Sequence, residues 1–167
     1  MEIIELKADQ KDKWKDKWND FVSKAKNGHL LQSWQWGQLK KDFGWESFYF
    51  VVLDNKEIKA ACLILRKKIM GYSFFYAPRG PVFNQDYENY LPPLFEMIHK
   101  KARQEKTIYF KIEPEIESTN IQFVNFLKSN KFIKSWHNIQ PTNTFILDLS
   151  KSEQELLSGM RRKIVNI

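Results

Sequence analysis

The sequence has little of several features that define large classes of protein. One cysteine in 167 residues, Cys62, excludes a disulfide framework and a Cys-rich zinc site, and it is consistent with a reducing compartment. Six glycines and six prolines exclude a fibrous or linker-like chain. No uncharged stretch approaches the roughly 18–20 apolar residues of a membrane span. The N-terminal segment MEIIELKADQ lacks the basic and apolar regions of a signal peptide. These absences indicate a soluble cytoplasmic domain.

The composition that is present suits a folded domain with a basic surface. Hydrophobic residues make up 43% of the chain and aromatic residues 15%, which is enough for a sizeable core. Lysine and arginine number 27 against 20 acidic residues, a net charge of +7. A surface of that sign favours nucleic acid, phosphorylated metabolites or anionic lipid headgroups as partners. Lysines that serve only solubility are the alternative explanation.

Hydrophobic periodicity predicts an alternation of helices and strands. The expected helices are residues 10–26, 33–43, 86–105 and 119–129, with Ser33 as a cap and a last helix that Ser150 begins in a capping box with Glu153. The expected strands are residues 46–53, 58–68, 72–77, 108–112, 132–136 and 144–149. Pro78 and Pro81 bracket a stiff loop that cannot continue the sheet. The order predicts a single α+β domain with mostly antiparallel strands.

Familiar catalytic signatures are absent from the sequence. It contains no G-x-S-x-G, no G-x-x-x-x-G-K-[ST], no H-E-x-x-H and no G-x-G-x-x-G. Cys62 lies in an apolar strand, which predicts a buried and unreactive thiol. Glu113 and Glu115 flank Pro114 at a strand end, where a carboxylate acts either as a general base or as a solvated turn residue.

A series of short strings, in a fixed order, resembles a known family. The strings are HLLQSWQWGQLK (29–40), FGW (43–45), YAPRGPV (76–82), FKIEPE (110–115), IQPTNT (139–144), LDLSKSE (147–153) and the basic MRRK (160–163) with NI (166–167). From about residue 18 onward the chain resembles the N-terminal part of the FemABX family. These are the peptidoglycan-bridge aminoacyltransferases that use aminoacyl-tRNA.

The resemblance implies a fold and a reaction. It implies a GNAT-like domain over residues 1–167, the N-terminal part of a two-domain transferase. The second domain, with the lysine usually linked to catalysis and most of the tRNA-facing surface, is expected to lie beyond the chain, so no catalytic residue is assigned here. The expected partners are UDP-MurNAc-pentapeptide or a lipid-linked peptidoglycan precursor, with aminoacyl-tRNA as co-substrate. A peripheral membrane contact is compatible with this reading, and no metal or organic cofactor is expected.

Three residues are candidates for precursor binding. The resemblance matches Lys40 to a family lysine that contacts the nucleotide-sugar diphosphate; a solvated helix lysine beside Lys41 is the alternative. Arg79 either contacts substrate from its proline-bracketed loop or ties that loop to a neighbouring carboxylate. Trp36, like Trp34, presents a flat surface to a uracil or sugar ring or belongs to the core.

Other functions remain open at this point. One is a non-catalytic fragment or paralogue that binds a UDP-sugar precursor or tRNA without turnover. Another is a stand-alone GNAT-type N-acyltransferase that uses acyl-CoA, which requires a glycine-containing pyrophosphate loop that the sequence lacks. A third is RNA binding through the basic residues 161–163, which predicts a steep dependence on salt.

Overall fold

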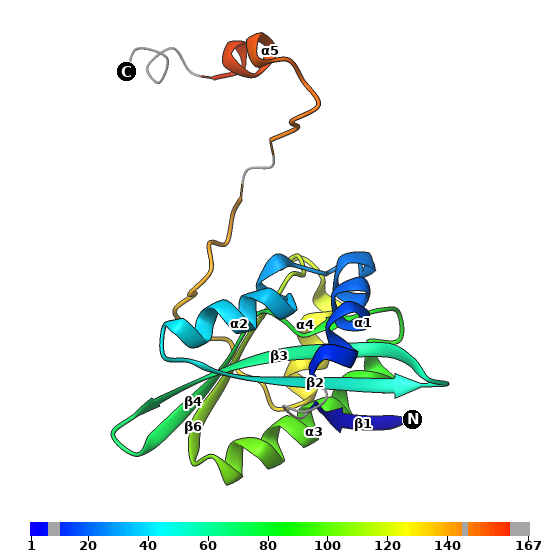
Figure 1. The fold of residues 1–167 in the computed structure, drawn as a ribbon, viewed down its shortest axis with the longest axis vertical. Coiled ribbons are helices and arrows are strands. Elements are labelled where there is room, and N and C mark those ends of the chain that lie inside the picture. The colour runs from blue at the N-terminus through cyan, green and yellow to red at the C-terminus, as the bar shows by residue number, and fades with distance from the viewer. Residues whose placement is uncertain (7–10, 145–146, 161–167) are drawn as a thin grey trace.

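The computed structural model describes residues 1–6, 11–144 and 147–160, with the backbone alone for Lys11 and Asp12. One mixed sheet forms its centre, and helices cover both faces (Figure 1). The strands are β1 (Glu2–Glu5), β2 (Glu46–Asp54), β3 (Glu57–Ile69), β4 (Tyr72–Arg79), β5 (Val82–Phe83) and β6 (Thr107–Pro114). The helices are α1 (Lys11–Lys24), the 3-10 helix η2 (Leu30–Gln32), α2 (Trp34–Asp42), α3 (Tyr87–Gln104), α4 (Ile121–Ser129) and α5 (Glu153–Ser158).

The sheet runs in the order β1-β2-β3-β4-β6, with β5 paired to β3. All pairs are antiparallel except β4 with β6, which are parallel. A parallel pair requires a crossover, and α3 provides it between these two strands. The predicted α+β class with a mostly antiparallel sheet is confirmed.

Successive side chains of a strand point to opposite faces of the sheet, so the sheet has a hydrophobic core on each face. On one face, Phe50, Cys62 and Phe75 pack against α3 and α4. On the other face, Tyr49 and Leu63 pack against α1 and α2. Cys62 is fully buried, as expected, and burial raises the pKa of its thiol.

The predicted helices and hairpins in residues 10–129 are confirmed to within a few residues, and the extra elements are short. Strand β1 has four residues and β5 has two, too few for a periodic signal. Strand β4 continues through Pro78 to Arg79, beyond its predicted end at residue 77. The N and the C=O of one strand residue point to the same side, and the Pro78 carbonyl accepts from Gln32. The missing N–H of Pro78 therefore faces Gln32, and no ladder bond to β6 is lost.

The two strands predicted after α4 are wrong for the residues that the structure describes. Phe132 packs between Phe95 and Phe110, but residues 133–136 are all exposed, and residues 132–136 pair with no strand among the described residues. Of residues 144–149, residue 144 and residues 147–149 are exposed and outside any strand; residues 145–146 are not among those described. The apolar residues of these segments therefore do not indicate backbone pairing here.

The chain leaves the sheet after Pro141 and extends to α5, which stands apart from it in Figure 1 and buries no residue. The capping box predicted for this helix exists two residues later than expected, between Ser152 and Glu155. Ser150 instead donates its hydroxyl to Asp148. The S-x-x-E pattern occurs twice in this segment, and the second copy forms the cap. The basic residues 161–163 lie outside the described part of the chain.

Candidate functional site

Helix α2 holds Lys40 at its C-terminal end. The helix begins with Ser33, whose hydroxyl accepts a hydrogen bond from the Trp36 N–H at 3.1 Å, as the sequence predicted. Gly44, with φ of +71°, then turns the chain from α2 into β2. Because Trp36 precedes Lys40 by four residues and Phe43 follows it by three, all three side chains lie on one side of the helix.

Three aromatic rings surround the Lys40 ammonium, and we call Lys40 with these three rings the Lys40 cluster. Its Nζ lies 5.5 Å from the ring centroid of Trp36, 5.6 Å from that of Phe43 and 5.5 Å from that of Trp45. Among the described residues, no carboxylate forms an ion pair with Lys40, and Trp36 Nε1 is buried without a hydrogen-bond partner. Cation–π contacts position an ammonium without neutralising its charge, which leaves Lys40 able to bind an anion.

A second lysine, which the sequence reading missed, lies beside this cluster. Lys67 Nζ is 5.6 Å from the Trp45 centroid and donates to the carbonyls of Phe43 and Gly44. Trp45 also packs edge-on against Phe74 of β4, which stacks on Tyr109 of β6 with centroids 5.5 Å apart. An aromatic strip therefore runs from the Lys40 cluster across β4 to β6. Strand alternation could have placed Lys67 and Phe74 on one face, but only the register shows that they pair.

The structure brings Lys40 and Trp36 together but gives Arg79 other partners. Arg79 Nη1 forms an ion pair with Glu115 Oε2 at 2.9 Å, and Nη2 donates to the carbonyl of Pro141 at 2.7 Å. These contacts correspond to the alternative in which Arg79 ties its loop to a neighbouring carboxylate. Trp34 is buried and stacks on Tyr49 with centroids 3.9 Å apart, so it belongs to the core. The ligand roles of Lys40, Arg79 and Trp36 stay predictions.

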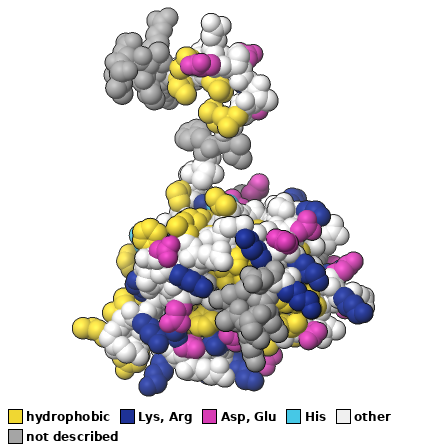
Figure 2. Space-filling model, viewed as in Figure 1, with side chains coloured by type: hydrophobic (Ala, Val, Ile, Leu, Met, Phe, Trp, Pro, Cys, Tyr) yellow, Lys and Arg dark blue, Asp and Glu magenta, His cyan; other side chains and the backbone are white. Residues whose placement is uncertain are grey.

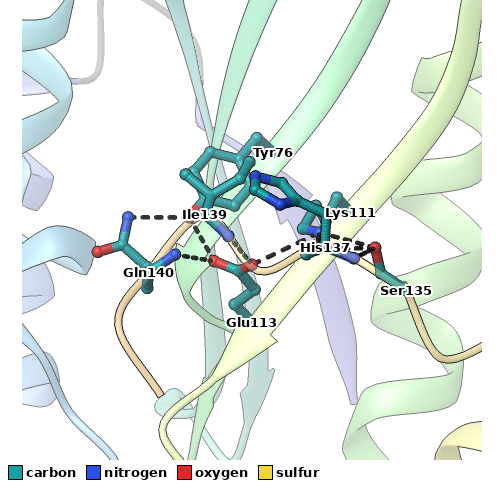
Figure 3. A network of polar contacts seen from close by, with 7 residues as sticks. All are labelled: Tyr76, Lys111, Glu113, Ser135, His137, Ile139 and Gln140. Carbon is teal, nitrogen blue, oxygen red and sulfur yellow. Dashed lines mark hydrogen bonds and ion pairs between the residues drawn. The ribbon is translucent and has the colours of Figure 1, made fainter. Parts of the chain in front are cut away.

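Glu113 organises a polar network at the ends of the parallel strands (Figure 3). Its carboxylate accepts hydrogen bonds from the Ile139 N–H at 2.7 Å, the Gln140 N–H at 3.1 Å and the Tyr76 hydroxyl at 2.6 Å. Lys111 Nζ lies 3.5 Å from Glu113 Oε1 and reaches the segment just before Ile139. Glu113 therefore holds residues 139–140 against β4 and β6.

The network also shifts the acidity of its members. Burial alone would raise the pKa of Glu113, but the hydrogen bonds from Tyr76, Ile139 and Gln140 and the charge of Lys111 together bring that pKa below its ordinary value. Burial and the bond to Glu113 raise the pKa of the Tyr76 hydroxyl. A carboxylate with so many donors is a weak base, so the general-base reading of Glu113 is not supported by its surroundings.

We expect Glu113→Gln to release the segment that crosses β4 and β6. The neutral amide presents an N–H₂ group to the donors that the carboxylate accepts, so amide hydrogen exchange at Ile139 and Gln140 should accelerate at least about tenfold. Because the pKa of Glu113 is lowered in the folded chain, its contribution is fully present above the ordinary value of 4.5 and is lost as the pH falls through the lower folded value.

Hydrogen–deuterium exchange across this pH range is the measurement. Wild-type protection at Ile139 and Gln140 should fall on acidification, whereas the Gln variant should show little change between the same pH values. Glu117→Gln, at an exposed glutamate whose carboxylate accepts a hydrogen bond from Thr119, is the control. Equal protection at Ile139 and Gln140 in Glu113→Gln and wild type would contradict the role of Glu113.

The described residues offer few sites for cofactors. No group of three or more potential metal-ligating side chains occurs among them. The start of α3 carries Asp86 and Glu88, whose negative charges oppose the binding of a phosphate at that helix N-terminus. Within the described part of the chain, no helix is both long and apolar enough to cross a bilayer.

Sequence comparison identifies relatives of the chain. A model of the FemAB family matches residues 14–135, more than half of the chain. A lipid II:glycine glycyltransferase of Staphylococcus epidermidis is 32% identical over 153 residues, which cover 86% of this chain and 37% of the relative. A protein of the same description from Staphylococcus aureus is 31% identical over 86% of this chain and 36% of its own length. The chain spans well under half the length of these relatives.

Structure comparison supports the same grouping. The crystal structure of FemX aligns with a TM-score of 0.78 and 28% identity over 98% of this chain and 41% of that one. A probable acetyltransferase aligns with a TM-score of 0.57 over 91% of this chain and the whole of its own, at 11% identity. At that identity the likeness concerns the fold alone, and it confirms the expected GNAT-like architecture.

Proposed function

The chain belongs to the FemAB family, and on that premise we propose that it forms the precursor-binding domain of an aminoacyltransferase of peptidoglycan bridge synthesis. In this proposal residues 1–167 form the N-terminal GNAT-like domain, act in the cytoplasm and contribute to the site that holds the acceptor precursor. The similarity to lipid II:glycine glycyltransferases supports a peptidoglycan precursor as the acceptor.

The reaction that we propose is an acyl transfer from aminoacyl-tRNA. The unprotonated amine of the precursor stem peptide attacks the ester carbonyl, the new amide bond forms, and the ester bond to tRNA breaks. The terminal ribose hydroxyl leaves with a proton, so that free tRNA is released and no net oxidation occurs. The contribution of this chain is to position the acceptor, which is worth several orders of magnitude in rate when geometry is fixed well. The proposal includes no metal or organic cofactor.

The Lys40 cluster is the observation that carries this proposal. An ammonium held among aromatic rings, without a carboxylate partner among the described residues, suits a phosphate oxygen of the precursor. Lys67 adds a second positive charge against the same Trp45 ring. The ring of Trp36 suits a sugar or uracil face. Arg79 is the weaker candidate contact, because both of its terminal nitrogens already have partners.

Calorimetric titration with UDP-MurNAc-pentapeptide tests the proposal. We expect saturable binding to the chain and at least about tenfold weaker binding for Lys40→Ala, equivalent to 1.4 kcal/mol. Lys41→Ala is a matched control, because it removes the same charge from the next, exposed position of α2. That variant should bind within about twofold of wild type.

Two results would count against the proposal. If Lys40→Ala and Lys41→Ala bind equally well, the cluster does not hold the phosphate. If the folded wild-type chain binds neither the nucleotide precursor nor its lipid-linked form in detergent micelles, the precursor-binding role itself is wrong. Binding only to the lipid-linked form would retain the role and identify the acceptor.

A further inference from the structure

The end of the β3–β4 hairpin exposes apolar side chains that the fold does not use. Ile69 pairs with Tyr72, so Met70 and Gly71 form a two-residue turn. Met70 is 95% exposed, and Ile69 and Tyr72 are exposed on either side of it. The hairpin projects from the sheet at the lower left of Figure 1. Three exposed apolar side chains within four residues of a projecting tip are unusual for a surface turn.

Turn geometry does not explain the methionine. Met70 and Gly71 have φ of 52° and 81°, the left-handed pair that favours Asn-Gly in a two-residue hairpin. The β2–β3 hairpin of the same sheet has the same kind of turn and uses polar residues, Asn55 and Lys56, with φ of 50° and 66°. At Met70 a long side chain takes an unfavourable backbone conformation without gaining burial. Lys56 takes the same conformation with a polar side chain, so it is the exposed apolar side chain, rather than the backbone, that sets Met70 apart.

The neighbouring strand enlarges the apolar surface. Strand β6 begins beside the start of β4, with Ser73 opposite Thr107, and its next residues Ile108 and Tyr109 are both exposed. In Figure 2, hydrophobic side chains gather at the lower left corner, where this hairpin lies, with Lys and Arg side chains next to them. We call the exposed side chains of residues 69, 70, 72, 108 and 109 the apolar tip.

Positive charge surrounds the apolar tip. Lys67 and Lys68 precede it on β3, and the exposed Lys106 lies beside Ser73, whose N–H donates to the Lys106 carbonyl. Glu46 at the start of β2 and Glu105 at the C-terminal cap of α3 both form ion pairs with the buried Arg66 of β3. The hairpin end therefore combines projecting aliphatic and tyrosine side chains with lysines that have no acidic residue among them in residues 66–75.

We propose that the apolar tip docks this chain on a lipid bilayer that contains anionic headgroups. Aliphatic side chains and tyrosine suit the interface between headgroups and acyl chains, and lysines behind them suit anionic phosphates. A projecting, convex end fits a deformable surface better than it fits the groove of a protein partner. This inference stands on the side chains of the hairpin and is independent of the proposed transfer reaction.

Co-sedimentation of the purified chain with vesicles tests the docking. Vesicles of phosphatidylglycerol and phosphatidylcholine in equal parts should bind the chain, and phosphatidylcholine alone should bind it at least about tenfold more weakly. Met70→Asn should lower partitioning about fivefold or more. Lys68→Glu with Lys106→Glu should lower it tenfold or more, since each lysine near such a surface contributes about fivefold. Binding should also weaken steeply as salt rises.

Controls separate docking from folding. Asparagine tolerates the left-handed conformation at residue 70, so Met70→Asn should melt at or above the wild-type temperature while losing vesicle binding. Ile121→Ser and Lys128→Glu, exposed positions on α4, should leave binding unchanged. Equal binding of Met70→Asn and wild type, or equal binding to both vesicle types, would overturn the proposal. Self-association of the wild type that Met70→Asn abolishes, without vesicle binding, would assign the tip to a second copy instead.

Discussion

Replacing Gln32 with leucine should destabilise the domain by about 3 kcal/mol or more. Gln32 is fully buried, and its amide makes three hydrogen bonds to backbone. Nε2 donates to the carbonyls of Leu63, at 3.2 Å, and Pro78, at 2.8 Å, and Oε1 accepts from the Leu63 N–H at 2.8 Å. Leucine fills a similar volume but satisfies none of these groups, so each is left buried without a partner.

The sheet explains why this amide matters. Strand β3 pairs with β4 only from Leu65 onward and with β5 only at Ala60 and Ala61, so the backbone of Leu63 faces a gap between those two strands. Gln32 fills the gap and bonds Leu63 as a neighbouring strand would. A Cβ on Gly80 would lie 2.5 Å from Gln32 Nε2, so the chain next to the gap depends on glycine at that position.

Chemical denaturation measures this effect. Gln38→Leu, the same substitution at an exposed position of α2, should change the free energy of unfolding by no more than about 0.5 kcal/mol. Gln32→Glu keeps the acceptor for the Leu63 N–H but loses the donor to both carbonyls, so it should also be strongly destabilised. A loss below about 1 kcal/mol in Gln32→Leu would show that water or a shifted strand satisfies Leu63.

Gln32 also shows which contacts could not be predicted from the sequence. Its place in the string HLLQSWQWGQLK contributed to the family resemblance, but its bonding partners lie 31 and 46 residues away. Local patterns predicted α1, α2 and the β2–β3 hairpin, because each depends on residues within a few positions of one another. The strands predicted after α4 failed for the opposite reason: a strand requires a partner, and alternation alone does not provide one.

The Lys40 cluster, too, could be predicted from the sequence only in part. The spacing of Trp36, Lys40 and Phe43 in the second helix is enough to put them on one side of it, where the structure has them. Trp45 reaches the cluster through the turn at Gly44, and Lys67 reaches it through the register of β2 on β3, in which Glu46 lies opposite Arg66; a hydrophobic period contains neither. Part of the candidate site is therefore local in sequence, and the rest depends on the tertiary fold.

Gly37→Ala is the second substitution for which we expect a large loss. In an ordinary helix interior this change stabilises by about 1 kcal/mol. Here a Cβ would lie 2.1 Å from the Tyr49 hydroxyl oxygen and 3.0 Å from Leu63 Cδ1, and the Gly37 carbonyl accepts a 2.6 Å hydrogen bond from Ser47 of β2. The methyl group must push α2 off the sheet, so we expect a net destabilisation of about 2 kcal/mol or more.

A double-mutant cycle with Tyr49→Phe identifies the cause. Tyr49→Phe alone removes the hydroxyl that donates to the Trp34 carbonyl and should cost about 1 kcal/mol. In the Gly37→Ala background it also removes the closest clashing atom, so the double variant should be more stable than the sum of the two losses predicts. Gln38→Ala, one position along α2, should be neutral or slightly stabilising. Strict additivity of the two losses would place the strain elsewhere.

The packing of Gly37 in the core also determines the geometry of the candidate site. Gly37 lies three residues before Lys40, and the close contact of α2 with β2 brings Trp45, which immediately precedes that strand, up to the Lys40 ammonium. Displacement of the helix by even a fraction of an ångström should loosen the three-ring cluster. Gly37→Ala should therefore weaken binding of UDP-MurNAc-pentapeptide at temperatures where the variant is still fully folded. Wild-type affinity in a destabilised Gly37→Ala chain would instead mean that Lys40 binds as a flexible charge, independent of the rings around it.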